Sequence, residues 1–411
     1  MEKIDTIFKN ATLLVVADAA TKGSMGILAL MIARFFGPQL YGQYATASAV
    51  CGIFLMITGI GGFEQEFTRR GSIDRGTLTK GLSLNLQLLL LTSFVATIAL
   101  IIYLALSPYS IELVGITLLL WIALTINRFH LPFRHLGLIL GQPGIVAIVQ
   151  GIGLFFLLTV ILSLLLNNAS LKSVVIAQIG VAVGITVVWF YWMRSRKLTL
   201  MPSNFAEMKV FFKHSLPFAA SNLLWVGYFN FDAFMLSFLR TEAEVGIYSA
   251  VYRIIAISYI IGYAVSNTFT PLLFKQFHAS VDNSDGLGKV LLRIMAFLSI
   301  FMGAGLYFLA PWFVMSILGM EYAEGIVIME ILSFSVFFRL LNFGLSELLT
   351  TSGRQTLRIK LELSLLLVNI IFNAVLIPYY GGVGAAIATL GAEAILFFLV
   401  FFSCKKFSIL N

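Results

Sequence analysis

The chain has 411 residues, of which 59% are hydrophobic and only 11% are charged, and its formal net charge is +8. Soluble domains carry roughly 25% charged residues, so this composition excludes a soluble protein and predicts one that crosses a membrane many times. The basic residues fall in alternate loops. That distribution is typical of membrane topology and argues against a nucleic-acid surface.

Hydrophobic stretches recur along the whole chain, and a spanning helix needs about 20 apolar residues. The longest polar break, at residues 194–214, falls near the middle of the chain. We predict an all-α membrane protein with an N-lobe of helices 1–6 (residues 1–200) and a C-lobe of helices 7–12 (residues 201–411). The twelve predicted spans are roughly 11–36, 40–67, 80–106, 111–139, 143–167, 171–194, 209–239, 243–277, 286–310, 322–352, 355–379 and 382–404.

The first span carries two opposite charges near its centre. Asp18 and Lys22 are four residues apart, which places them on one face of a helix. A charge at mid-bilayer costs at least about 2.5–3.5 kcal/mol, so it faces a partner, a bundle interior or a water-filled cavity. This span therefore predicts a polar space inside the membrane.

The orientation follows from the loops. Nineteen of the 27 Lys and Arg residues lie in the terminal segments and the even-numbered loops, whereas the odd-numbered loops hold only Lys172 and Arg240. Because basic loops stay in the cytoplasm, both termini are predicted to be cytoplasmic.

A short pattern recurs in the two halves. Gly42-Gln43-Tyr44-Ala45 follows the first span, and Gly246-Ile247-Tyr248-Ser249 follows the seventh, 204 residues later. A weaker echo places Gly141 and Gly353 at the ends of the fourth and tenth spans. Six spans per half give two lobes that run the same way through the membrane, which is one of the repeat symmetries of secondary transporters.

Ionisable residues at depth occur in both halves, as expected for a cavity between the two lobes. The cations are Lys22, Arg128, Arg253 and Arg339, and the acids are Asp18, Asp232 and Glu393. Each charge could instead belong to a structural pair, such as Asp18 with Lys22 or Asp232 with Arg253. Arg34 and Arg293 lie nearer the ends of their spans and are expected to reach the headgroups.

Three stretches, taken in order, resemble one family. They are ARFFGPQLYGQYATAS (33–48), YFNFDAFMLSFLRTEAEVGIYSAVYRI (228–254) and SGRQTLRIKLELSLLLVNIIFNAVLIPYYGGVGAAIAT (352–389). They resemble bacterial oligosaccharide flippases of Wzx type, within the multidrug/oligosaccharidyl-lipid/polysaccharide exporter superfamily, and the match covers nearly the whole chain.

The resemblance implies a MATE-like, two-lobed bundle in the bacterial inner membrane that works by alternating access. Its implied substrate is an undecaprenyl-diphosphate-linked oligosaccharide, such as an O-antigen unit for lipopolysaccharide, moved to the periplasmic leaflet. Its implied partners are membrane lipid and other polysaccharide assembly proteins.

An anionic diphosphate needs cationic donors, and the fork of an arginine matches phosphate oxygens. We therefore predict substrate contacts from Arg253, Arg339, Lys22 and Arg128. No nucleotide-binding run appears in the sequence, so the energy comes from an ion gradient or from the substrate's own gradient. Asp18, Asp232 and Glu393 are the candidate sites for a coupling proton or sodium ion.

Two other functions compete with this interpretation of the sequence. A multidrug or organic-cation antiporter of the same superfamily would have an acidic or aromatic cavity, whereas the predicted cavity leans basic. A membrane polysaccharide polymerase or ligase would need a sizeable outer loop with acid and base groups. The main candidates for such outer carboxylates are Glu321 and Glu324 in residues 311–325, an apolar surface segment, and no histidine joins them. The four histidines show no metal spacing, and no metal or cofactor is expected.

Overall fold

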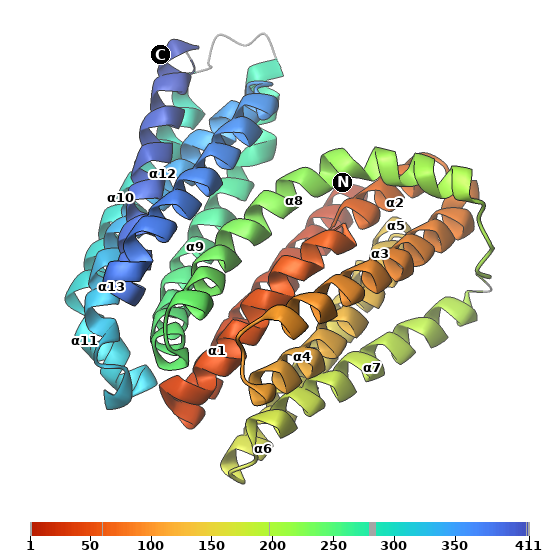
Figure 1. Cartoon of the computed structure of the whole chain (residues 1–411). Helices are drawn as coiled ribbons and strands as arrows, with labels where there is room; N and C mark the ends of the chain where they lie inside the picture. The colour runs from red at the N-terminus through yellow and green to blue at the C-terminus, as the bar shows by residue number, and fades with distance from the viewer. Residues whose placement is uncertain (1, 60, 197, 279–284, 408, 410–411) are drawn as a thin grey trace. The chain divides into compact units, whose positions relative to one another are not determined.

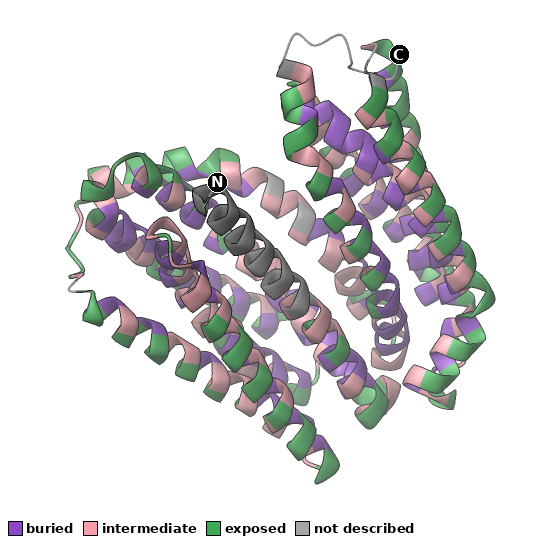
Figure 2. Ribbon diagram, turned by 180° about the vertical axis from the view of Figure 1, so that it is seen from behind, coloured by how far each residue is buried: buried purple, intermediate pink, exposed green. Residues whose placement is uncertain are grey.

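The structure is a computed structural model that describes residues 2–59, 61–196, 198–278, 285–407 and 409, all of its regular structure there being helical (Figure 1). The all-α prediction is confirmed. Contacts divide the chain into two compact units, one of residues 1–25 and 46–230 and one of residues 26–45 and 231–411. Buried residues lie along the inner sides of the helices of each unit (Figure 2). The predicted lobe boundary near residue 200 stays a prediction.

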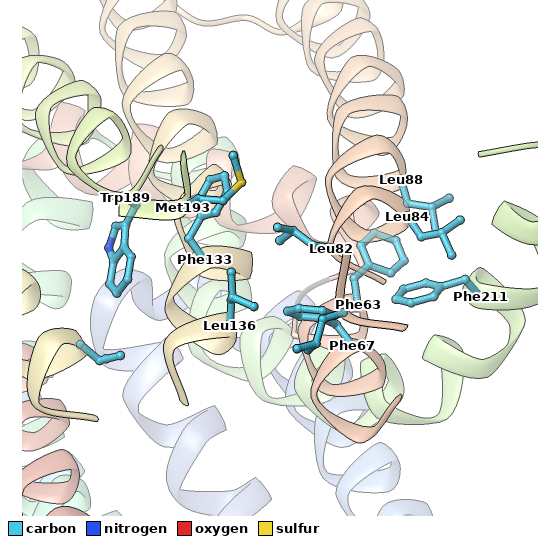
Figure 3. Packing of buried hydrophobic residues seen from close by; sticks show 12 residues of the cluster. Phe63, Phe67, Leu82, Leu84, Leu88, Phe133, Leu136, Trp189, Met193 and Phe211 are labelled. Carbon is cyan, nitrogen blue, oxygen red and sulfur yellow. The ribbon is translucent and has the colours of Figure 1, made fainter. Parts of the chain in front are cut away.

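The first unit takes both ends of α1 and most of the helices up to residue 230. Its core joins Phe63 and Phe67 to Leu82, Phe133 and Trp189 (Figure 3). These side chains come from four different helices, so the apolar contacts hold the bundle together. The elements that lie wholly or partly in this unit are α1 (Glu2–Leu55), α2 (Gly62–Ile73), α3 (Leu78–Leu106), α4 (Ile111–Phe129), α5 (Leu131–Ile139), α6 (Pro143–Leu166), α7 (Leu171–Ser195) and α8 (Phe205–Leu239), whose residues from 231 onward belong to the second unit.

The predicted second span, residues 40–67, is interrupted. Helix α1 ends at Leu55, a 3-10 turn occupies Met56–Thr58, and α2 begins at Gly62. Gly59 and Gly61 have φ angles of 66° and 71°. Only glycine adopts this left-handed conformation without a steric cost, so these glycines allow the break.

The second unit is built from α9, α10, α12 and α13, with α12 packed against the other three. A hydrophobic core of this unit includes Leu273, Leu291, Met295 and Leu348. Residues 310–322 form short helical turns and not another span. The elements are α9 (Glu242–His278), α10 (Asp285–Phe308), α11 (Ala310–Phe313), a π-helical turn (Val314–Leu318), a 3-10 turn (Met320–Tyr322), α12 (Gly325–Thr351) and α13 (Gln355–Lys406).

Helix α13 is a hairpin of two helices. Its backbone is not helical at Gly381, where φ is 55° and ψ is −132°. A Cβ added to Gly384 would lie 2.5 Å from the carbonyl oxygen of Leu376, although eight residues of straight helix would separate these positions by about 12 Å. A Cβ on Gly391 would likewise meet Phe372 at 2.8 Å. The chain therefore turns back at Gly381, as the two last predicted spans require.

Nine helices in the described residues are long and apolar enough to cross a membrane. One of them is the α13 hairpin, and another, in α1, contains a non-helical Gly37. Helix α8, with 35 residues, is outside that set because of its polar residues. The architecture is thus consistent with twelve crossings.

The weaker sequence echo has a common backbone geometry. Gly141 and Gly353 have φ angles of 72° and 80°. The N–H of Gln142 donates to the carbonyl of Gly137 at 2.9 Å, and the N–H of Arg354 donates to that of Leu349 at 2.9 Å. Both glycines end a helix in the same way, with the bond pattern of a Schellman motif.

A buried carboxylate organises charged residues at one end of the first unit. Glu66 of α2 accepts hydrogen bonds from Arg69 at 2.8 Å and from Arg70 at 2.6 Å. Nδ1 of His214 in α8 lies 3.6 Å from the same carboxylate. Burial alone would raise the pKa of Glu66, but the hydrogen bonds from the two guanidinium groups outweigh it and hold the pKa below its ordinary value.

Replacing Glu66 with glutamine is expected to lower the free energy of unfolding at pH 7 by about 1–3 kcal/mol. A carboxylate with a pKa lowered by folding stabilises the protein above its unfolded pKa, and this contribution is lost as the pH falls through the folded value. The difference between wild type and Glu66→Gln should therefore shrink below about pH 4.5. Thermal unfolding in detergent at pH 7 and pH 4 measures this, and an equal difference at both values contradicts it.

Candidate functional site

A buried carboxylate lies at the centre of the second unit. Asp232, near the end of α8, is 4% exposed. The hydroxyl of Tyr248 in α9 donates to its Oδ2 at 2.6 Å, and the hydroxyl of Thr389 in α13 donates to the same oxygen at 2.7 Å. The amide of Asn373 donates to its Oδ1 at 2.6 Å and to the Oδ1 of Asn369 at 3.1 Å. Three helices thus converge on one carboxylate.

The donors around Asp232 are all neutral. Among the described residues, no Lys, Arg or His forms an ion pair with it. An unpaired charge in an apolar interior is costly, so such a carboxylate is either protonated or accompanied by a small cation. Hydroxyl, amide and carboxylate oxygens are ligands that hard cations prefer. The cluster can therefore hold a proton or an alkali cation.

A second buried pair lies one turn away on α13. Arg339 of α12 donates to Oε1 of Glu393 at 2.6 Å, and Asn342 donates to Oε2 at 2.9 Å. Arg339 is 4% exposed and Glu393 is fully buried. Glu393 follows Thr389 by four residues, so the ion pair and the Asp232 cluster share one helix face. The guanidinium also lies 5.0 Å from the ring centroid of Phe343.

Arg253 differs from Arg339 because its side chain is exposed, although it lies within the candidate span Glu242–Phe277. It hydrogen bonds to the hydroxyl of Tyr41, a residue that is itself buried. A guanidinium at this depth faces water or a polar ligand more favourably than lipid.

The remaining predicted residues lie in the first unit. Nη2 of Arg128 is 3.5 Å from Oε1 of Glu64, a carboxylate that is 1% exposed. Oε2 of Glu64 and Nε of Arg128 have no hydrogen-bond partner in the described part of the chain. Asp18 and Lys22 are in α1, but their side chains fall outside the described residues. The substrate and ion roles of all these residues stay predictions.

The sequence pointed to Asp232, Arg339 and Glu393 as separate candidates, and the structure brings the three into neighbouring networks. The considered pairing of Asp232 with Arg253 is not the one formed, because Asp232 takes neutral partners. Thr389 and Tyr248 were missed as partners. Tyr248 had a signal of its own, since it is the tyrosine of the repeated Gly-x-Tyr pattern.

Residues 7–277 match the model of a protein family described as "Polysaccharide biosynthesis protein". The capsular polysaccharide biosynthesis protein CapF of Staphylococcus aureus is 29% identical over 189 residues. That alignment covers 45% of this chain and 47% of CapF, so it spans less than half of the relative.

Two solved structures resemble the whole chain. A lipid II flippase MurJ in an inward closed conformation aligns with a TM-score of 0.73 and 17% identity, covering 96% of this chain and 87% of that one. An inward-facing multidrug resistance MATE family transporter of the MOP superfamily aligns with a TM-score of 0.68 and 15% identity, covering 94% and 95%. At these identities the likeness establishes a shared fold, and the MATE-like prediction is confirmed.

Proposed function

The chain belongs to the polysaccharide biosynthesis protein family and is a membrane transporter, and from this premise we propose that it is a flippase for a lipid-diphosphate-linked oligosaccharide. The proposed direction is from the cytoplasmic to the outer leaflet, by alternating access. The named activity of MurJ, which has the same fold, supports a lipid-linked substrate. The charge distribution supports cytoplasmic termini.

The observation that carries the proposal is the exposed Arg253 within an apolar span. A permanently charged group at this position suits a water-filled path that an anion crosses. Its planar donors match the oxygens of a diphosphate. Arg339 is less suited to this contact, because its guanidinium is buried and bonded to Glu393. We assign the diphosphate contact to Arg253 and a positioning role to Arg339.

The Asp232 cluster is the proposed coupling site. A carboxylate surrounded by hydroxyl and amide groups binds a proton or a sodium ion when the path is open to one side. Occupancy of Asp232 would change the charge inside the second unit and so favour one conformation over the other.

Replacing Arg253 with alanine is expected to reduce export of surface polysaccharide at least about tenfold, because a bidentate contact to phosphate is worth more than about 1.4 kcal/mol. Arg253→Lys should recover only part of the activity, since a point charge replaces a two-pronged donor. The measurement is surface polysaccharide in cells that lack the native exporter, normalised to the amount of this protein in the membrane.

The matched control is Arg293→Ala in α10, another exposed arginine within a predicted span, which should leave export unchanged. Normal export by the Arg253→Ala protein would contradict the proposed contact between Arg253 and the diphosphate. An antiporter for organic cations, the competing function, predicts instead that Arg253→Ala raises resistance to cationic drugs, because it removes a repelling charge from the path.

A further inference from the structure

One arginine lies in a part of the chain that carries few basic residues. Arg240 directly follows α8 and is, with Lys172, one of only two Lys or Arg residues in the odd-numbered loops. Basic loop residues set membrane topology, and a cation in these loops works against the orientation that the other loops favour. The position of Arg240 is therefore explained by its contacts and not by topology.

The contacts of Arg240 are with the first arm of the α13 hairpin. Its Nε donates to the carbonyl oxygen of Ile377 at 3.0 Å, and its Nη2 donates to that of Pro378 at 2.9 Å. These carbonyls lie in the last turn before the backbone reverses at Gly381. The last four carbonyls of a helix have no partner within that helix, and a cation beside them also offsets the helix dipole. One guanidinium thus caps the first arm of the hairpin.

A carboxylate completes this contact. Oε2 of Glu244, in the first turn of α9, lies 3.8 Å from Nε of Arg240. A Cβ added to Gly381 would overlap the same oxygen, and the φ of Gly381, 55°, already favours glycine. The tip of the hairpin therefore fits closely against the turn between α8 and α9. We call this contact of Arg240 and Glu244 with residues 377–381 the hairpin clamp.

The same hairpin supplies two of the hydrogen-bond donors to Asp232. Asn373, on the first arm, donates to its Oδ1, and Thr389, on the second arm, donates to its Oδ2. Asn373 precedes the capped carbonyl of Ile377 by four residues, or about 6 Å of helix. Thr389 follows Gly381 by eight residues, or about 12 Å. The place of the hairpin tip therefore sets the place of both donors.

Asp232 is joined to the clamp through α8. It precedes Arg240 by eight residues, about 12 Å of helix, and the N–H of Arg240 donates to the carbonyl of Leu236 at 2.9 Å. Helices α8 and α13 are thus tied together at two levels, by the Asp232 cluster and by the clamp. The bonds from Asn373 and Thr389 to Asp232 are 2.6 and 2.7 Å long, and a displacement of about 1 Å would break them.

We propose that Arg240 is a positioning residue for the coupling site: by capping the α13 hairpin, it holds Asn373 and Thr389 at hydrogen-bonding distance from Asp232. Its guanidinium acts through the hairpin and not on the ion directly. The proposal rests on the coupling role that the proposed function gives to the Asp232 cluster. It requires that loss of the clamp weaken ion binding about 12 Å away along α8, which a contact that only stabilises the fold would not do.

The test measures ion binding by the purified full-length protein in detergent, without substrate. Sodium chloride is titrated against choline chloride at constant ionic strength, and protons are titrated in a sodium-free buffer. The unfolding temperature is recorded, because a bound ion stabilises the folded state. The coupling ion is the one whose stabilisation is lost in Asp232→Asn. If neither ion stabilises the wild type through Asp232, the proposed coupling site is wrong and Arg240 has no site to position.

We expect Arg240→Gln to shift the midpoint of this titration at least about fivefold towards higher ion concentration, the lower end of couplings between separate sites. Arg240→Lys should shift it less, since the charge is kept but the two-pronged donor is lost.

The matched control is Arg358→Gln. The side chain of Arg358 is 31% exposed, against 26% for Arg240, and it bonds to Thr350 and Glu362 near the other end of the first arm. This variant should lower the unfolding temperature and leave the midpoint unchanged, because its contacts are far from the hairpin tip.

A double variant shows whether Arg240 acts through the hairpin. Thr389→Val removes one of the positioned donors, so Arg240→Gln should weaken ion binding less in that background than in the wild type. Additive effects would overturn the proposal. So would an unchanged midpoint in folded Arg240→Gln while the response still depends on Asp232. Where Arg240→Gln does not fold, Arg240→Lys decides between the same outcomes.

Discussion

Replacing Asp232 with asparagine is expected to abolish the response of export to an ion gradient. The carboxylate is the only charged group in its cluster among the described side chains, so its loss removes the ligand that attracts a cation. A contact with a charged group contributes about 1.5–3 kcal/mol, which corresponds to roughly a 10- to 150-fold loss of ion affinity. The measurement is the rate of flipping in proteoliposomes with an imposed sodium or pH gradient.

Thr389 supplies the matched control for this experiment. Thr389→Ser keeps the hydroxyl that bonds to Asp232 and should retain gradient dependence, whereas Thr389→Val removes that oxygen and should weaken it. Comparing the two gradients identifies the coupling ion. A fully gradient-dependent Asp232→Asn protein would show that Asp232 has a structural role and that the ion binds elsewhere.

Removing one partner of the buried pair Arg339–Glu393 is expected to destabilise the protein by about 3–5 kcal/mol, because the other charge is left uncompensated in an apolar interior. Arg339→Met and Glu393→Gln should each lower the unfolding temperature strongly. The double variant should recover most of the loss, since no charge remains at the site. Thermal unfolding in detergent measures both effects.

The same variants separate packing from transport. If Arg339 positions α12 against α13 and does no more, the folded double variant should also export normally. A double variant that is stable yet inactive would restore Arg339 as a direct substrate contact. An unstable double variant would show that the hydrogen bond from Asn342 cannot hold the site without the ion pair.

Much of the fold was predictable because the bilayer restricts the structures that a membrane-spanning segment can adopt. Apolar stretches near 20 residues long mark spans without any knowledge of packing. The repeated glycines are also visible in the sequence, but the contact between them cannot be predicted from it. Gly42 and Gly246 form a repeat signature in the sequence, and only the structure shows that they touch. Contacts between positions 204 residues apart leave no local trace.

The sequence predicted which charged residues belong to the site, but not which residues pair with one another. Asp232, Arg339 and Glu393 stand out because charged residues are rare in apolar segments. Which of them pair depends on how the helices rotate about their axes, and that rotation is set by packing across the whole unit. The neutral partner Thr389 could not be distinguished from the other hydroxyl residues of the spans. For the same reason, the sequence did not indicate that Glu64 is the partner of Arg128.

The distance along the chain between Asp232 and its partners has a consequence for how the protein is made. Asn373 and Thr389 follow Asp232 by 141 and 157 residues. At about 5–20 residues per second, the ribosome delivers them roughly 7–30 s after Asp232 has been synthesised. During that interval the acidic residue has entered the membrane, and the α13 hairpin that completes its surroundings does not yet exist. Insertion of the α13 hairpin, the last to be synthesised, is therefore the step that supplies these hydrogen-bond partners to Asp232. A chain that stalls before this step leaves the carboxylate in the membrane without them, in a form that quality-control proteases recognise.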